Sequence, residues 1–244
     1  MKAIKNKILA IIPARAGSKR IPNKNIKNFL GKPLIAYTIE QALKCPIVDR
    51  VIVDTDSLKI AYIAKHYGAE VPFLRPAKFA NDKAKVVDSL FHLLGRLKKE
   101  QGYTPTHVMI LQTTSPLREL KDIDDCWNLM KKTDADTVLT VCPTHPRLYY
   151  MDKKQNIILA NGSEKQSTNM QAWRPAYILN GCLVYIVKTG ALRAEHSIIT
   201  KNTKAVVCDK WRSVDLDEPG DWALAELLYK NKNIIASWIK KLNS

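Results

Sequence analysis

Long apolar runs are missing from this sequence. No stretch approaches the ~20 apolar residues that a membrane-spanning helix needs, and the N-terminal MKAIKNKILAIIPAR lacks the cleavage pattern of a signal peptide. The five cysteines include no CxxC pair and stand mostly in apolar runs, which predicts reduced core thiols instead of disulfides or a zinc site. We therefore expect a cytoplasmic protein with no membrane partner.

Acidic residues are also scarce. The chain has 23 Asp and Glu against 39 Lys and Arg, which gives a formal net charge of +16. Such an excess fits nucleic acid, an anionic membrane surface or an acidic small substrate, and charge alone does not choose among them. With 244 residues, of which 46% are hydrophobic, the chain can bury the core of a single domain spanning residues 1–244.

Short apolar runs rich in β-branched residues alternate with longer segments of helical spacing. The runs read as strands buried on both faces and cover residues 8–12, 51–53, 108–111 and 138–141. The helical segments cover residues 33–43, 58–67, 86–98 and 123–130. This alternation predicts an α/β fold with a mostly parallel sheet flanked by helices, in which ligands bind at the carboxyl ends of the strands.

The alternation stops at about residues 143–175, where short polar and aromatic pieces predict a small inserted lobe. Strand patterns return at 182–187 and 205–208, and a last helix is predicted at 219–229 with Asp217 as its N-cap. Asp56 is predicted to cap the helix at 58–67 in the same way. The tail at 230–244 has the pattern of an amphipathic helix; packing on the body is expected, with membrane or partner binding as the alternative.

The segment IIPARAGSKRIPNKN, residues 11–25, places many cations at the end of the first predicted strand. These cations are Arg15, Lys19, Arg20 and Lys24. Neither the GxxxxGK[ST] loop nor the dinucleotide fingerprint is present. Gly17 and Ser18 nevertheless offer backbone and hydroxyl donors, so the loop suits a triphosphate; a solvated basic loop is the alternative.

A second pattern, SVDLD at residues 213–217, alternates two carboxylates. In an extended segment Asp215 and Asp217 would face the same way with Cα atoms about 6.5–7 Å apart, and both could ligate Mg²⁺. The alternative is that Asp217 caps the last helix and Asp215 is solvated. Together, the cations and the paired carboxylates favour phosphoryl or nucleotidyl transfer.

Six segments occur in the order seen in cytidylyltransferases that activate sialic acid and related nine-carbon keto-acid sugars. They are IPARAGSKRIPNKN, LGKPLIAYTIEQAL, VIVDTDS, LRPAKFANDKA, LQTTSPLR and SVDLDEPGDW. The chain thus resembles the CMP-N-acylneuraminate synthetase family up to about residue 229. The resemblance implies a Rossmann-like nucleotidyltransferase fold, CTP as donor, Mg²⁺ as cofactor, and a homodimer formed through the inserted lobe with Tyr149, Tyr150 and Trp173.

The same resemblance assigns site residues by motif position. The catalytic set is Arg15, Lys24, Asp215 and Asp217, and the last two are the metal ligands. The nucleotide set is Arg15, Gly17, Ser18, Lys24, Asn25, Arg75 on the cytosine side, and Asp82. The sugar set is Gln112, Arg174, Asn180, Gly181 and Tyr185. The alternatives are a surface ion pair for Arg75, a loop-holding role for Gln112, and ordinary packing or surface positions for Arg174 and Tyr185.

Two other functions remain as alternatives at this stage. One is activation of the eight-carbon sugar of lipopolysaccharide core, an enzyme whose opening loop usually lacks the GSK…NKN pattern. The other is a basic nucleic-acid-binding module, which the absence of a recognition motif and the scatter of cations over many helices disfavour. We expect no nucleic-acid partner, and the sequence leaves the nine-carbon sugar open among N-acetylneuraminate, legionaminate, pseudaminate and their relatives.

Overall fold

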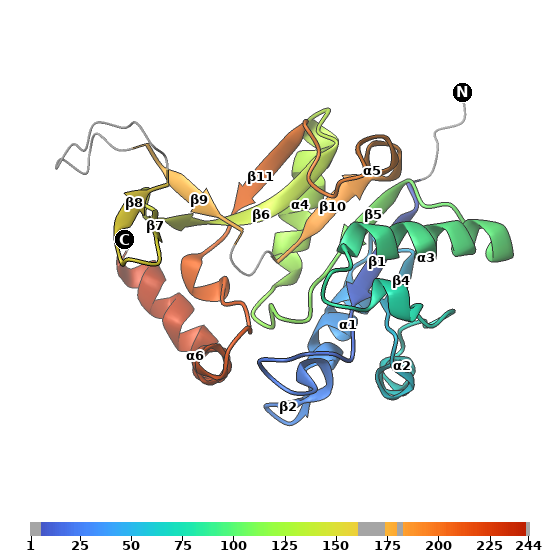
Figure 1. Ribbon diagram of the computed structural model, residues 1–244, viewed down its shortest axis with the longest axis horizontal. Coiled ribbons are helices and arrows are strands. Elements are labelled where there is room, and N and C mark those ends of the chain that lie inside the picture. The colour runs from blue at the N-terminus through green and yellow to red at the C-terminus, as the bar shows by residue number, and fades with distance from the viewer. Residues whose placement is uncertain (1–5, 161–173, 180–182, 243–244) are drawn as a thin grey trace.

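A computed structural model describes residues 6–160, 174–179 and 183–242, which form a central seven-stranded sheet (Figure 1). The strand order is β11-β6-β10-β5-β1-β4, and β9 pairs with β6. The strands are β1 (Ile8–Pro13), β4 (Arg50–Asp54), β5 (His107–Ile110), β6 (Thr137–Thr144), β9 (Ala176–Ile178), β10 (Tyr185–Lys188) and β11 (Thr203–Val207). The predicted strands are therefore present, with ends that differ by a few residues.

The sheet confirms the mostly parallel arrangement, with β10 and β9 as exceptions. β1 pairs in parallel with β4 and β5, and β11 pairs in parallel with β6. β10 runs antiparallel to both β5 and β6, and β9 runs antiparallel to β6. Because β1 lies between β4 and β5, the strand order reverses there, and a ligand crevice is expected at the carboxyl ends of these three strands.

Helices cover both faces of the sheet (Figure 1). α1 (Leu34–Lys44), α2 (Leu58–His66) and α4 (Leu120–Lys132) pack on one face, and α3 (Val86–Gln101) and α5 (Thr189–Glu195) pack on the other. Along β1, Ile8, Ala10 and Ile12 join the first layer, while Leu9 and Ile11 join the second. Burial on both faces explains why the strand sequences are continuously apolar.

The predicted inserted lobe begins as a continuation of β6, which runs on to Thr144. The hairpin of β7 (Tyr149–Met151) and β8 (Ile157–Leu159) follows, and β9 then returns to pair Ile178 with Cys142 of β6. Figure 1 places β7, β8 and β9 at the end of the molecule opposite α3. Trp173, which was expected to join Tyr149 and Tyr150, lies outside the described residues.

The last helix and the tail form one helix, α6 (Pro219–Leu242). The side chain of Asp221 accepts hydrogen bonds from the backbone N–H groups of Asp217 (3.1 Å) and Glu218 (2.8 Å). The prediction of Asp217 as the N-cap is therefore wrong, because α6 begins at Pro219 and Asp217 lies one residue outside the N-cap position, where Asp221 binds its N–H. The packing prediction is also wrong for Ile234 and Trp238, which are exposed by 52% and 64%.

A small third core joins the start of α6 to the opening segment. Trp222 of α6 meets Phe29 of β2 (Asn28–Phe29) edge to face, with ring centroids 5.5 Å apart. Ile21, in the cation-rich segment after β1 (residues 14–25, here called the basic loop), and Leu216 of SVDLD lie in the same buried cluster. Aromatic contacts of this kind stabilise by about 0.5–1.5 kcal/mol each beyond area burial. This core holds residues 213–217 next to the basic loop although the two are distant in sequence.

The remaining short elements are β3 (Lys32–Pro33) and the 3₁₀ turns η1 (Lys24–Ile26), η2 (Ala77–Phe79) and η4 (Lys210–Arg212). Four cysteines in the described part, Cys45, Cys126, Cys142 and Cys208, are buried free thiols, as predicted, and Cys182 lies outside it. None of the described helices has both the length and the apolar character needed to cross a bilayer.

Candidate active site

The basic loop leaves the carboxyl end of β1 and is fastened at once to β4 and the turn after it. Ala14 N–H donates to the carbonyl of Asp54 (3.0 Å), and Ala16 N–H donates to Oδ1 of Asp56 (2.9 Å). The predicted capping role of Asp56 is wrong, because the hydroxyl of Ser57 accepts the hydrogen bond at the start of α2. Asp56 instead fixes the path of the loop.

Asn25 fastens the other end of the loop. Its Nδ2 donates to the carbonyl of Arg15 (2.9 Å), and its Oδ1 accepts from the Thr113 hydroxyl (2.6 Å). Both ends of the buried amide are therefore engaged within the protein. At Gly17 a Cβ would meet no atom within 4 Å, so space alone does not demand glycine there.

The four loop cations pair with two carboxylates. Nη1 of Arg15 lies 2.8 Å from Asp82, which also binds Lys19. Asp217 pairs with two cations: its Oδ1 lies 3.2 Å from Nζ of Lys24, and its Oδ2 lies 3.3 Å from Nη1 of Arg20. Hydrogen bonds from Lys19 and then Arg15 lower the pKa of the Asp82 carboxyl, so Asp82 is an anion facing the cations. The geometry makes Asp82 a counter-ion of the loop in this structure, and its assignment to the nucleotide contacts stays a prediction.

A cavity of about 620 Å³ opens at the carboxyl ends of β1 and β5. Eight of the predicted site residues line it, namely Arg15, Ser18, Lys24, Asn25, Arg75, Gln112, Tyr185 and Asp217. The antiparallel register sets Tyr185 of β10 beside Ile110 of β5, which explains how a residue at the start of a strand reaches this edge of the sheet. Arg174 is exposed near β9 and does not line this cavity, while Asn180 and Gly181 lie outside the described residues.

The SVDLD segment bends where an extended strand was expected. The N–H of Asp217 donates to the carbonyl of Asp215 (2.9 Å), which closes a tight turn. The N–H of Leu216 donates to the carbonyl of Thr114 (3.1 Å), and this holds the turn against the segment after β5. Asp217 is exposed toward the cations, whereas Asp215 is half-buried behind it.

Asp215 has the features of an incomplete ligand. Its Oδ1 is buried and has no hydrogen-bond partner among the described residues. Burial raises the pKa of the Asp215 carboxyl above its ordinary value, and the charge of Asp217 adds to the rise. The described residues contain no cluster of three or more potential metal ligands. Two carboxylates with an unsatisfied oxygen fit Mg²⁺, which takes one or two protein carboxylates and completes its shell with water and phosphate.

Comparison with known proteins identifies the family. Residues 9–207 match the family described as Cytidylyltransferase. The chain is 35% identical over 226 residues to a CMP-N,N'-diacetyllegionaminic acid synthase of Legionella pneumophila, covering 91% of this chain and 96% of that protein. It is 31% identical over 230 residues to a pseudaminic acid cytidylyltransferase of Campylobacter jejuni, with 92% and 97% covered. The chain belongs to the cytidylyltransferase family. It is therefore a nucleotidyltransferase.

One further relative and one solved structure agree with this assignment. The present chain is 31% identical over 236 residues to an N-acylneuraminate cytidylyltransferase of Escherichia coli, covering 94% of this chain and 54% of that protein. A solved CMP:2-keto-3-deoxy-manno-octonic acid synthetase complexed with CTP superposes with a TM-score of 0.67 at 17% identity, covering 93% of this chain and all of that one. At that identity the match supports the Rossmann-like nucleotidyltransferase fold and nothing finer.

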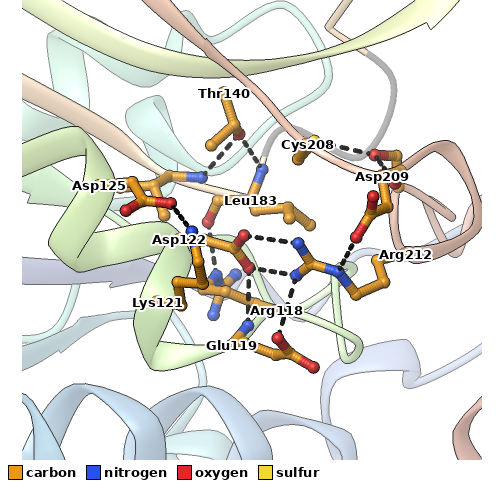
Figure 2. Close-up of polar contacts among 12 residues, drawn as sticks. Arg118, Glu119, Lys121, Asp122, Asp125, Thr140, Leu183, Cys208, Asp209 and Arg212 are labelled. Carbon is orange, nitrogen blue, oxygen red and sulfur yellow. Dashed lines mark hydrogen bonds and ion pairs between the residues drawn. The ribbon is translucent and has the colours of Figure 1, made fainter. Parts of the chain in front are cut away.

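Two buried arginines that were not foreseen from sequence, Arg118 just before α4 and Arg212 at the end of η4, fix segments close to the site (Figure 2). Arg118 is fully buried and donates to the carbonyls of Gln112 and Leu183, one on each of two neighbouring chain segments. Its Nη1 also lies 3.2 Å from Oε1 of Gln41. The backbone of Gln112, a predicted sugar contact, is thus fixed by Arg118.

Arg212 fastens the start of the SVDLD turn in a similar way (Figure 2). Its Nη1 and Nη2 donate to the two carboxylate oxygens of Asp122, at 2.6 and 2.9 Å, and its Nε donates to Oδ2 of Asp209 at 3.1 Å. Asp122 in turn accepts from the N–H of Glu119 in the capping box of α4. Burial alone would lower the pKa of Arg212, but its bonds to Asp122 raise it overall, so the guanidinium stays charged. Because Ser213 follows directly, this buried pair ties SVDLD to α4.

Replacing Arg212 by methionine is expected to lower the free energy of unfolding by about 3–5 kcal/mol, because Asp122 would be left buried and unpaired. Urea denaturation measures the change. Lys121→Met is the matched control on the same helix, because it removes only an exposed pair with Asp125 that contributes about 0.3–0.5 kcal/mol. Equal effects of the two substitutions would show that the Arg212 pair is not the anchor described.

Proposed function

We propose that this cytidylyltransferase activates a nine-carbon keto-acid sugar of the nonulosonic class with CTP. The anomeric hydroxyl oxygen attacks the α-phosphorus, the bond to the β-phosphate bridging oxygen breaks, and the hydroxyl proton is released. The products are the CMP-sugar and pyrophosphate. One observation carries this proposal: the loop cations and Asp217 meet across one cavity of about 620 Å³ at the carboxyl ends of β1 and β5.

The cations of the basic loop serve the triphosphate. Arg15 and Lys24 point into the cavity and are held by Asp82 and Asp217, which triphosphate oxygens would replace as partners. Charge-assisted hydrogen bonds of this kind are stronger than neutral ones and orient the phosphates. The work of these residues is positioning and charge neutralisation, which dominate catalysis of phosphoryl and nucleotidyl transfer.

Asp215 and Asp217 are proposed to hold Mg²⁺ with the triphosphate. When bound, the ion neutralises charge that develops on the phosphates. The unsatisfied Oδ1 of Asp215 supports this assignment because a buried carboxylate oxygen is stabilised by a ligand. The turn that brings Leu216 against Thr114 keeps Asp217 at the cavity edge, with Asp215 directly behind it in the chain.

The sugar is proposed to lie along Gln112 and Tyr185, where Ile198 and Ile199 add apolar surface. Asn180 and Gly181 remain proposed contacts by motif position. Support for the nonulosonic class comes from the names of the relatives, which act on diacetyllegionaminic acid, pseudaminic acid and N-acylneuraminate. The cytoplasm is the proposed site of action.

A pyrophosphate-release screen tests this proposal. Each NTP is paired with N-acetylneuraminate, a diacetyllegionaminate, a pseudaminate and an eight-carbon keto-acid. Release that requires both CTP and a nine-carbon acid supports the proposal, and release with the eight-carbon acid alone overturns it. Salt-dependent retention of RNA or DNA on a filter, with no release, would favour the nucleic-acid alternative.

A homodimer formed through the lobe is also proposed, because the β7–β8 hairpin exposes a large apolar surface. The exposed side chains include Leu148, Tyr149, Tyr150, Met151, Ile157 and Ile158, at 42–70%. Apolar side chains clustered in this way mark an interaction surface.

Tyr150→Asp combined with Ile158→Asp is expected to convert the dimer to a monomer, because two charges would be buried in the interface. Light scattering after gel filtration measures the mass. Tyr62→Asp is the control, since Tyr62 is a similarly exposed aromatic on α2, 76% exposed. A wild-type protein that is monomeric at micromolar concentration would contradict the dimer.

A further inference from the structure

The second half of α6 extends beyond the part that packs on the body. In its first half, Trp222, Ala225 and Tyr229 belong to the third core. From residue 230 to residue 242, in contrast, no side chain is buried. Figure 1 draws α6 leading away from the sheet, at the end of the molecule opposite α3. Because short helical segments are only marginally stable in water without packing, this half of α6 is expected to have a partner.

A stripe of large apolar side chains runs along the exposed side of α6. Its members are exposed by 46–85% and are Leu224, Leu227, Ile234, Trp238 and Leu242. At 3.6 residues per turn they fall on one face, opposite the face that carries Trp222 and Ala225 into the third core. Exposed apolar side chains gathered in this way mark an interaction surface, whereas single ones do not.

The charge around this stripe has one sign. From Leu227 to Ser244 the sequence contains four lysines and no Asp or Glu. Two of the lysines adjoin the stripe, since Lys230 follows Leu227 by three positions and Lys241 follows Trp238 by three. Both lysines are exposed. The surface therefore suits a partner that is anionic and also accepts apolar side chains.

This combination selects among the possible partners. In a two-fold dimer the same patch meets itself, so a second copy laid on the stripe would set lysines against lysines. Nucleic acid would leave the aliphatic side chains of the stripe without a partner, because bases stack on aromatic rings. An anionic bilayer satisfies both features: its headgroups attract the lysines, and the boundary of its acyl chains accepts tryptophan and aliphatic side chains.

We propose that the exposed face of α6 binds the surface of a bilayer that contains anionic phospholipid, with the stripe in the headgroup boundary and Lys230 and Lys241 at its edge. This inference goes beyond the proposed reaction. It also departs from the expectation of no membrane partner, which rested on the lack of a spanning segment. A helix that lies in the interface needs no such segment.

Cosedimentation of the full chain with vesicles of phosphatidylglycerol or of phosphatidylcholine tests the proposal. Binding to phosphatidylglycerol is expected to be at least about tenfold tighter, and to weaken as sodium chloride is raised. Lys230→Gln combined with Lys241→Gln is expected to weaken it about tenfold or more, because each lysine near an anionic surface contributes about fivefold. Lys98→Gln combined with Lys99→Gln is the matched control, since it makes the same charge change at an exposed pair at the end of α3.

A second pair of variants tests the apolar stripe without changing charge. Ile234→Ser combined with Trp238→Ser is expected to weaken binding to phosphatidylglycerol vesicles at least about tenfold, because apolar surface is lost from the contact. Leu58→Ser combined with Tyr62→Ser is the control, since these residues have the same spacing on α2 and are exposed by 75% and 76%. Circular dichroism establishes that each variant is folded, and the lysine variants carry the test if the serine variants are not.

The proposal is overturned if the wild type does not bind phosphatidylglycerol vesicles or binds both lipids equally. It is also overturned if the controls on α2 and α3 lose as much binding as the variants on α6. Light scattering covers the remaining partner: a dimeric wild type that ignores vesicles, with a monomeric Ile234→Ser and Trp238→Ser variant, would assign the stripe to a second copy. None of these measurements uses a substrate, so their outcome is independent of the proposed reaction.

Discussion

Replacing Asp215 by asparagine is expected to reduce turnover at least about a thousandfold, because several kcal/mol of charge stabilisation at the phosphates would be lost with the proposed metal ligand. The free energy of unfolding of the ligand-free protein is expected not to fall. Burial raises the pKa of this carboxyl, which means that the folded state holds the charged form at a cost, and asparagine removes that charge. Steady-state pyrophosphate release and urea denaturation measure the two effects.

A second readout does not depend on turnover. Mg²⁺ with CTP is expected to raise the melting temperature of the wild type by ligand binding to the folded state, and to raise that of Asp215→Asn less. Glu218→Gln is the matched control, since Glu218 is an exposed carboxylate in the same segment that does not line the cavity. Wild-type turnover in Asp215→Asn, or equal thermal shifts in both proteins, would rule out the metal assignment.

Lys24→Met is expected to lower kcat/KM by about 100- to 1000-fold, the range found when one donor to a developing phosphate or oxyanion charge is removed. Lys24 is the most buried cation of the basic loop, and its Nζ bonds both the carbonyl of Leu216 and Asp217. It therefore connects the basic loop to the SVDLD turn. Progress curves at varied CTP concentration measure the change.

Lys19→Met provides the comparison within the same loop. Lys19 is 79% exposed and pairs with Asp82, so an effect of at most about fivefold is expected from an interaction of about 1 kcal/mol or less. If the two variants lose activity equally, the loop acts through its total charge and not through the placement of Lys24. If neither loses activity, the loop does not bind the triphosphate.

The fold was predictable to the extent that it follows from local periodicity. Strands buried on both faces are continuously apolar and amphipathic helices repeat every 3.6 residues, so their positions could be read directly. The direction of β10 could not, because an apolar run looks the same in a strand of either direction. The N-cap of α6 was also misassigned to Asp217, since only the backbone path shows that the helix begins at Pro219 and that Asp221 in its first turn accepts from the N–H groups before it.

The site was predictable in part for a related reason. Arg15, Lys24 and Asp217 stand in short motifs whose residue types indicate binding of a triphosphate and a metal ion, and the structure brings them to one cavity. Arg118 closes the LQTTSPLR motif and Arg212 directly precedes SVDLD, but the residue type at these positions does not show that either side chain is buried. A single arginine beside a helix start resembles any surface cation, and its burial becomes evident only when its carbonyl or carboxylate partners are in place.

The sequence by itself determined the order of strands and helices, the free core thiols and the anionic character of the ligand, because each follows from residue types over short spans. Only the tertiary structure decided which carboxylate neutralises which cation, that Asp54 buries its charge against Arg75, and that the SVDLD turn lies beside the basic loop. These outcomes depend on distances between residues far apart in the chain. Such distances are set by packing, and no local pattern encodes them.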